Sequence, residues 1–205
     1  MIIRSIETLI SCGIERIILG TGYHREVYEE LKKKYPQIET CFSPKYAETN
    51  SMYTLYNTRE LIGNDDFLLL ESDLIFEQKA ITSLLEYSKP DALLIASITK
   101  FQDQYYVESG ANGALEKCSV NKEELNPDGE FVGIHKISSD FFHKMCEDYA
   151  SIVDESPKLG YEYELIRMSR NIKPLYVLKV ENLQWYEIDD IEDLRYAEDN
   201  IKIEM

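Results

Sequence analysis

Acidic residues directly follow a predicted buried strand. The stretch FLLLESDLIFE (67–77) begins as an apolar run and continues into Glu71, Asp73 and Glu77 without a Gly or Pro break. Ligands of open α/β sheets bind beyond the carboxyl ends of the strands, where we expect these acids to lie. Clustered carboxylates repel one another, and Mg²⁺ relieves that repulsion because it prefers carboxylate oxygens together with substrate phosphates. The stretch therefore indicates a magnesium site.

A second set of acids lies near the end of the chain, in WYEIDD (185–190). If this segment is extended, Glu187 and Asp189 point to the same face by the two-residue period of a strand. Together with Asp73, these two carboxylates would form a metal-binding site. Equally, Asp73 would be a solvated strand-end residue and Asp189 or Asp190 the N-cap of the following helix. On the residues alone, both interpretations stay open.

The composition argues against several classes of protein. The 205 residues are 44% hydrophobic, which is enough for the core of one domain, or of two small lobes at most. Acids outnumber bases by 38 to 22, and the net charge of -16 argues against a nucleic-acid surface. The four cysteines form no CxxC pair, so neither a zinc site nor a disulfide framework is expected. No apolar run approaches the ~20 residues that span a bilayer, and we expect a cytoplasmic protein with no membrane partner.

The elements that must position these acids alternate between strands and helices. This alternation predicts an α/β fold with a mostly parallel sheet covered on both faces. Between about residues 104 and 137 the sequence pattern changes to short strands separated by glycines. This pattern predicts an antiparallel elaboration of the sheet. The expected strands are 16–20, QIETCF, 66–72, 91–97 and LYVLKV, and the expected helices are 50–61, 77–87, 139–150, 161–170 and IEDLRYAEDNIK.

Four segments carry a resemblance to a known family. SPKYAETNSMYTLYNTREL, DDFLLLESDLIFE, GEFVGIHKIS and WYEIDDIEDLRYAE together resemble the 2-aminoethylphosphonate and phosphocholine cytidylyltransferases, over about residues 2 to 200. The resemblance implies a single Rossmann-like nucleotidyltransferase domain over 1–205. It also implies an enzyme that uses CTP and Mg²⁺, attaches CMP to the oxygen of a small zwitterionic phosphonate or phosphate, and releases pyrophosphate. We expect 2-aminoethylphosphonate as the substrate, with phosphocholine or another phospho-compound as the alternative.

The resemblance also assigns metal and catalytic residues. Asp73 matches the metal-binding Asp after the central strand, and Asp189, with Glu187 beside it, matches the C-terminal metal carboxylates. Asp73 and Asp189 are therefore the expected catalytic acids. Lys136 is the expected catalytic cation for phosphate or phosphonate oxygens, because it ends the apolar stretch FVGIHK (131–136) and does not lie in a charge run.

Three residues are expected near the nucleotide. Asn50 and Ser51 begin a helix after KYAET, and in the family pattern this corner lies against the nucleotide. The alternative is a plain N-cap, which Asn and Ser both favour. Lys45 is a further candidate cation for the phosphates, with a solvated loop lysine as its alternative.

The segment GYEYEL (160–165) is expected to bind the second substrate. Its residues Tyr161, Glu162, Tyr163 and Glu164 would hold a small ammonium group between acids and aromatic faces. Tyr and Glu are also ordinary helix-surface residues, so that alternative stays open.

The chain departs from the family pattern at its beginning. The pattern opens with a strand and a Gly-rich loop carrying an Arg, whereas this chain starts at MIIRSIETL. That loop supplies backbone N–H groups to the triphosphate. We therefore expect no measurable cytidylyl transfer from the 205-residue chain alone, unless a partner chain or a homodimer donates the strand. A non-catalytic homologue or partner subunit is the alternative function.

Overall fold

The computed structural model describes residues 1–98 and 104–203, which divide into two compact units. The first unit contains Met1–Ile14, Leu68–Ile137 and Pro174–Met205. The second unit contains Glu15–Phe67 and Ser138–Lys173. The expectation of a single domain over residues 1–205 stays a prediction.

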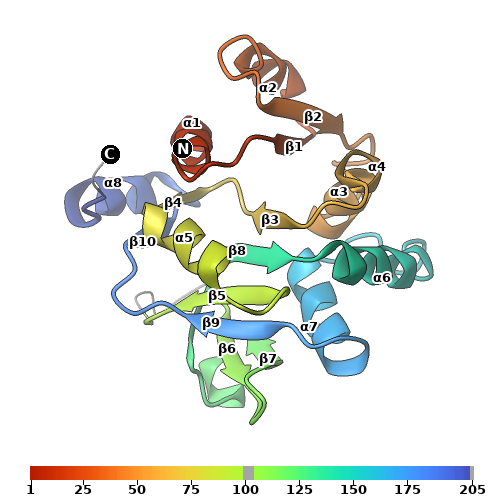
Figure 1. Ribbon diagram of the computed structural model, residues 1–205, viewed down its shortest axis with the longest axis vertical. Helices are drawn as coiled ribbons and strands as arrows, with labels where there is room; N and C mark the ends of the chain where they lie inside the picture. The colour runs from red at the N-terminus through yellow and green to blue at the C-terminus, as the bar shows by residue number, and fades with distance from the viewer. Residues whose placement is uncertain (99–103, 204–205) are drawn as a thin grey trace. The chain divides into compact units, whose positions relative to one another are not determined.

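The first unit is built on a sheet whose strands follow the order β7-β6-β8-β5-β9, with β3 also paired to β8. The strand β5 lies fully buried between antiparallel β8 and parallel β9 (Figure 1). Its sequence ALLIA is apolar at every position, as a strand covered on both faces requires. The strands are β3 (Phe67–Leu70), β5 (Ala92–Ala96), β6 (Tyr106–Ser109), β7 (Leu115–Ser119), β8 (Gly129–Ile137) and β9 (Tyr176–Lys179).

A two-stranded ladder and three helices complete the first unit. The strands β4 (Leu74–Phe76) and β10 (Trp185–Glu187) pair antiparallel. The helix α1 (Ile2–Ser11) packs on β4, and α5 (Gln78–Glu86) packs on β5 and β8. The helix α8 (Ile191–Asn200) follows β10, and a short 3₁₀ turn spans Lys122–Glu124.

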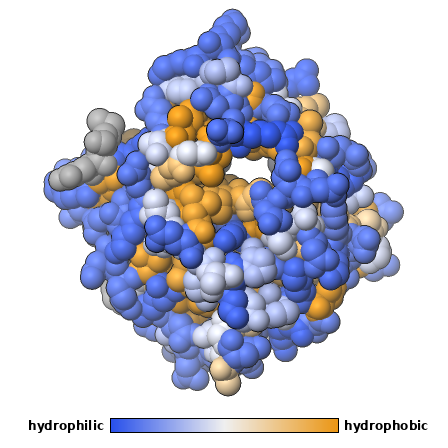
Figure 2. Space-filling view, in the orientation of Figure 1, coloured by the Kyte–Doolittle hydropathy of each residue, from blue (hydrophilic) through white to orange (hydrophobic). Residues whose placement is uncertain are grey.

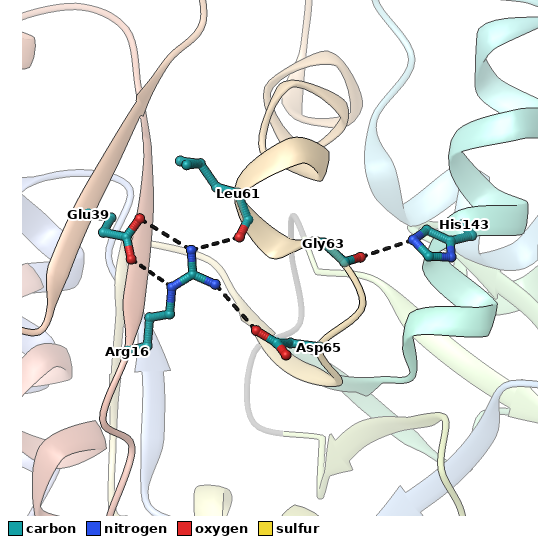
Figure 3. Close-up of polar contacts among 6 residues, drawn as sticks. All are labelled: Arg16, Glu39, Leu61, Gly63, Asp65 and His143. Atoms are coloured by element: carbon teal, nitrogen blue, oxygen red, sulfur yellow. Dashed lines mark hydrogen bonds and ion pairs between the residues drawn. The ribbon is translucent and has the colours of Figure 1, made fainter.

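The second unit contains a two-stranded parallel sheet, β1 (Ile17–Thr21) with β2 (Ile38–Phe42). Arg16, just before β1, donates to the Glu39 carboxylate on β2 at 2.6 Å, to the Leu61 carbonyl at 2.7 Å and to Asp65 at 3.3 Å (Figure 3). His143 donates from Nε2 to the Gly63 carbonyl at 3.0 Å in the same view. The Arg16 guanidinium lowers the pKa of Glu39 through the hydrogen bond between them.

The second unit also contains five helices, of which α2 and α3 contact the small sheet. The helices α3 and α6 both contact α7, and their core includes Phe141, Phe142, Tyr149 and Leu165. The bounds are α2 (Arg25–Leu31), α3 (Ser51–Asn57), α4 (Arg59–Ile62), α6 (Ser139–Ala150) and α7 (Tyr161–Asn171). The predicted helix 50–61 is thus divided in two at Thr58, which is both the C-cap of α3 and the N-cap of α4.

The α/β architecture is confirmed, but antiparallel pairing extends further than the sequence predicted. Parallel pairing joins β1 to β2 and β5 to β9, and the predicted antiparallel elaboration is present as β6, β7 and β8. However, β8 also pairs antiparallel with β5, and β4 with β10. Parallel neighbours need a crossover, usually helical, whereas β8 follows β5 through the β6–β7 hairpin and returns in the opposite direction.

Hydrophilic residues cover most of the face shown in Figure 2, in agreement with the net charge of -16. Within residues 1–98 and 104–203, no helix combines the length and the apolar character needed to cross a bilayer.

A buried carboxyl group links α6 and α7. The Glu164 side chain is 0% exposed and accepts from Arg167 at 3.2 Å, while Arg167 also pairs with Asp148 on α6. Burial raises the pKa of Glu164 to about 7, assisted by the hydrogen bond to Asp148 and opposed by Arg167. The folded protein therefore holds a proton on this group at pH values where the unfolded chain has lost it.

We expect the substitution Glu164→Gln to remove a pH dependence of stability. The raised pKa makes the Glu164 contribution largest below the unfolded value of 4.5, and it is lost as the pH rises through about 7. Relative to the Gln variant, the wild type should thus lose on the order of 2–3 kcal/mol of unfolding free energy across that window. Urea unfolding between pH 4.5 and 8 measures the difference. Glu147→Gln, which removes an exposed carboxyl group from α6, is the control, and a flat difference for Glu164→Gln would contradict the assignment.

Candidate metal centre

The ladder between β4 and β10 brings two distant acidic segments together in the first unit. Glu187 on β10 lies opposite Leu74 on β4, and the Ile188 N–H donates to the Asp73 carbonyl at 2.9 Å. Asp73 directly precedes β4, so this register sets it beside Glu187. The two predicted metal segments therefore meet.

Three carboxylates form one group at this position. Oxygen atoms of Glu71, Asp73 and Glu187 lie within 4.8 Å of one another, and all three residues are half-buried. Three partly desolvated oxygens of like charge repel strongly, whereas a hard divalent cation takes such oxygens as ligands. The donor set therefore fits Mg²⁺ in its chemistry. Glu71 belongs to the strand end from which the sequence argument started, but the resemblance did not assign it a metal role.

A bulge in β8 makes room for Glu71. The β5–β8 register shifts between Leu93, opposite His135, and Ile95, opposite Phe131. Gly133 lies inside this irregularity at φ 75° and accepts from the Glu71 N–H at 3.0 Å. A methyl group on Gly133 would overlap the Glu71 carboxylate. Position 133 requires glycine for two reasons: the positive backbone angle, and the space that the Glu71 carboxylate occupies.

The acids after Glu187 have different roles. Asp189 is exposed and is not part of the three-carboxylate group, and its N–H donates to Asp193 at 3.1 Å. Asp190 is the N-cap of α8 and accepts from the N–H groups of Glu192 and Asp193 at 2.7 and 3.0 Å. The N-cap alternative is thus confirmed for Asp190, while metal binding by Asp189 stays a prediction.

The structure does not gather Lys136 with the carboxylates. Its ammonium donates to the Tyr87 carbonyl at 3.0 Å, at the end of α5. A cation at a helix C-terminus is favoured by the helix dipole. This contact offers no support for the expected catalytic role of Lys136, which stays a prediction. The sequence FVGIHK does not reveal which carbonyl lies beside the lysine.

In the second unit, the predicted nucleotide and substrate residues lie together. The Ser51 hydroxyl accepts from the Tyr161 N–H at 3.0 Å, so a residue of α3 caps the start of α7. Asn50 is the N-cap of α3, accepting from the Ser51 N–H at 2.8 Å, and its amide donates to the Lys158 carbonyl at 3.4 Å. The N-cap interpretation of Asn50 is confirmed, and a nucleotide contact by Asn50 or Ser51 stays a prediction. Lys45 lies exposed in the turn before α3.

The four residues of the YEYE segment differ in exposure. Tyr161 is buried and Tyr163 is 51% exposed. Glu162 is half-buried, and its carboxylate lies over Gly160, where any side chain would displace it. Burial raises the pKa of Glu162, so a cation beside it would stabilise its charged form.

Glu164, by contrast, is fully buried against Arg167 and Asp148. This burial offers no support for the expected substrate role of Glu164, which stays a prediction. Its position on the inner face of α7 separates it from Glu162.

The chain is similar to known cytidylyltransferases. No family model matches the chain. The chain is 26% identical over 204 residues to the choline-phosphate cytidylyltransferase of Streptococcus pneumoniae, covering 97% of this chain and 83% of that protein. It is 27% identical over 81 residues to the 2-aminoethylphosphonate cytidylyltransferase of Lancefieldella rimae, covering 40% of this chain and 33% of that protein.

Among solved structures, the inositol-1-phosphate CTP transferase from T. maritima matches with a TM-score of 0.79 at 15% identity, covering 94% of this chain and 77% of that one. This is the nucleotidyltransferase fold. The fold class expected from the resemblance is confirmed, and the relatives are nucleotidyltransferases, as the expected enzyme class requires.

We predict that Gly133→Ala destabilises the protein more than Gly113→Ala does. Both glycines have nearly the same backbone angle, φ 75° and 76°, so both substitutions carry a similar backbone strain. Nothing lies within 4 Å of a Cβ at Gly113, whereas at Gly133 it would meet Glu71. The extra cost at Gly133 should be about 1–3 kcal/mol, as for other overpacked sites. Urea unfolding of both variants measures it, and equal costs would show that Glu71 does not depend on the glycine.

Proposed function

We propose that the chain is a cytidylyltransferase that transfers CMP from CTP to a small phospho-compound and releases pyrophosphate. The observation that carries the proposal is the group formed by Glu71, Asp73 and Glu187. Nucleotidyl transfer needs a divalent cation on the triphosphate, and three converging carboxylates are suited to hold it. The cytidylyltransferase relatives and the shared fold support the choice of reaction.

The proposed roles follow from the chemistry of the residues. Asp73 and Glu187 hold Mg²⁺ from the ends of β4 and β10, with Glu71 as the third oxygen ligand. We retain Asp189 as a further ligand, because it follows Glu187 by two residues and is exposed. When bound, the cation neutralises charge on the triphosphate and on the departing pyrophosphate.

The reaction needs no covalent intermediate with the protein. An ionised phosphonate or phosphate oxygen of the substrate is already a nucleophile, and it forms a bond to the α-phosphorus of CTP. The bond from that phosphorus to the bridging oxygen breaks, and the electron pair leaves with pyrophosphate. The protein residues therefore act by positioning and by neutralising charge.

We propose that the start of α7 recognises the ammonium group of the substrate. Glu162 supplies a half-buried carboxylate, and the exposed Tyr163, whose ring borders the same space over Gly160, supplies an aromatic face. A primary ammonium donates hydrogen bonds to a carboxylate, whereas a quaternary one is held by an aromatic cage. The acid at this corner favours 2-aminoethylphosphonate. Phosphocholine is the second candidate, favoured by the longer likeness to a choline-phosphate enzyme.

Pyrophosphate release from CTP in the presence of Mg²⁺ tests the reaction, with 2-aminoethylphosphonate or phosphocholine as the second substrate. We expect a higher kcat/KM for 2-aminoethylphosphonate than for phosphocholine. The reverse preference would replace the substrate, and no turnover with either compound would overturn the function.

We predict that Asp73→Asn and Asp189→Asn abolish turnover, while Asp190→Asn leaves it nearly unchanged. All three substitutions remove one negative charge. Asn is as good an N-cap as Asp, so Asp190→Asn preserves the start of α8 and serves as the matched control. Pyrophosphate release at saturating Mg²⁺ is the measurement. Wild-type rates in the Asp73 variant would remove that residue from the metal centre.

A further inference from the structure

Gln104 contacts the carboxylate group from a distant part of the chain. It is 3% exposed, and its Nε2 donates to Glu187 Oε2 at 2.6 Å. An ionised carboxylate only accepts hydrogen bonds, so the NH₂ end of the amide must face Glu187. The contact joins residues separated by 83 positions in sequence, and both belong to the first unit.

The segment of Gln104 is fixed to the same strand that fixes Glu71. The Tyr105 carbonyl accepts from the Phe131 N–H on β8 at 2.9 Å, and the two rings pack with centroids 6.1 Å apart. Two residues further along β8, Gly133 makes room for Glu71. The strand β8 thus positions the neighbours of two carboxylates.

A glutamate ligand needs such a fixed neighbour. Glu187 has a long side chain, and a free carboxylate would turn away from two other negative groups nearby. The bond from Gln104 occupies one lone pair of one oxygen. An ionised carboxylate has about four acceptor sites, so this one bond can orient Glu187 without using up its capacity to bind a cation.

From these contacts we infer that Gln104 is a positioning residue: it holds the Glu187 carboxylate in the orientation in which it binds a divalent cation. The inference rests on the proposed function, in which Glu187 is a metal ligand. A residue that only filled the core would contribute to stability but not to metal affinity. Partners of metal ligands are different, because their loss typically weakens metal binding about 10–100-fold.

The test compares Mn²⁺ affinity in the nucleotide-free protein, measured by electron paramagnetic resonance, for three forms. Gln104→Met keeps the volume of the side chain and removes the donor. Gln78→Met is the matched control, because Gln78 also belongs to the first unit and its amide donates to Ser11 instead. We expect the Gln104 variant to bind Mn²⁺ about 10–100-fold more weakly than wild type, and the Gln78 variant to bind as wild type does.

The other possible results distinguish a failure of the inference about Gln104 from a failure of the proposed function. Wild-type Mn²⁺ affinity in Gln104→Met overturns the inference and leaves the proposed metal centre in place. A wild-type protein that binds no Mn²⁺ overturns the metal centre and the inference together. If Gln104→Met does not fold, Gln104→Asn replaces it: the amide is kept but is one methylene too short to reach Glu187, and the same loss of affinity is expected.

Discussion

Mutual repulsion among Glu71, Asp73 and Glu187 is the constraint on which the first unit depends. Their oxygens lie within 4.8 Å of one another in a half-buried position, where the effective dielectric is lower than in water. In the absence of a cation this arrangement lowers stability, so the surrounding fold must hold it in place. In sites of this kind the folded protein is less stable, but its metal ligands are already in place before the cation binds.

The fold holds these carboxylates through backbone geometry. The β4–β10 register sets Glu187 beside Asp73, and the bulge at Gly133 gives Glu71 its space. The buried strand β5 supports β8, which carries the bulge. Because register and bulge are properties of hydrogen-bonded strands, the backbones that carry these carboxylates cannot move apart without breaking ladder bonds.

The sequence predicted the parts of this site that local periodicity encodes. Asp73 follows an apolar run, and Glu187 lies in a segment with the two-residue period of a strand, so the sequence alone indicates both as candidate ligands. The sequence does not indicate Gln104, because its partner is 83 residues away and a lone glutamine has no recognisable pattern. The contacts of Lys136 and Glu164 are hidden from the sequence for a related reason. Their neighbours, the Tyr87 carbonyl and Arg167 with Asp148, depend on how the helices pack, which neither residue's sequence context reveals.

The most direct measurement of the central claim is the unfolding temperature of the nucleotide-free protein in rising Mg²⁺, against NaCl at matched ionic strength. Both salts screen the general repulsion of a chain with net charge -16. Only Mg²⁺ should add a saturable stabilisation that grows with the logarithm of its concentration above the dissociation constant, because it binds the folded carboxylates. Coincident curves for the two salts would show that Glu71, Asp73 and Glu187 bind no cation, and the account would fail.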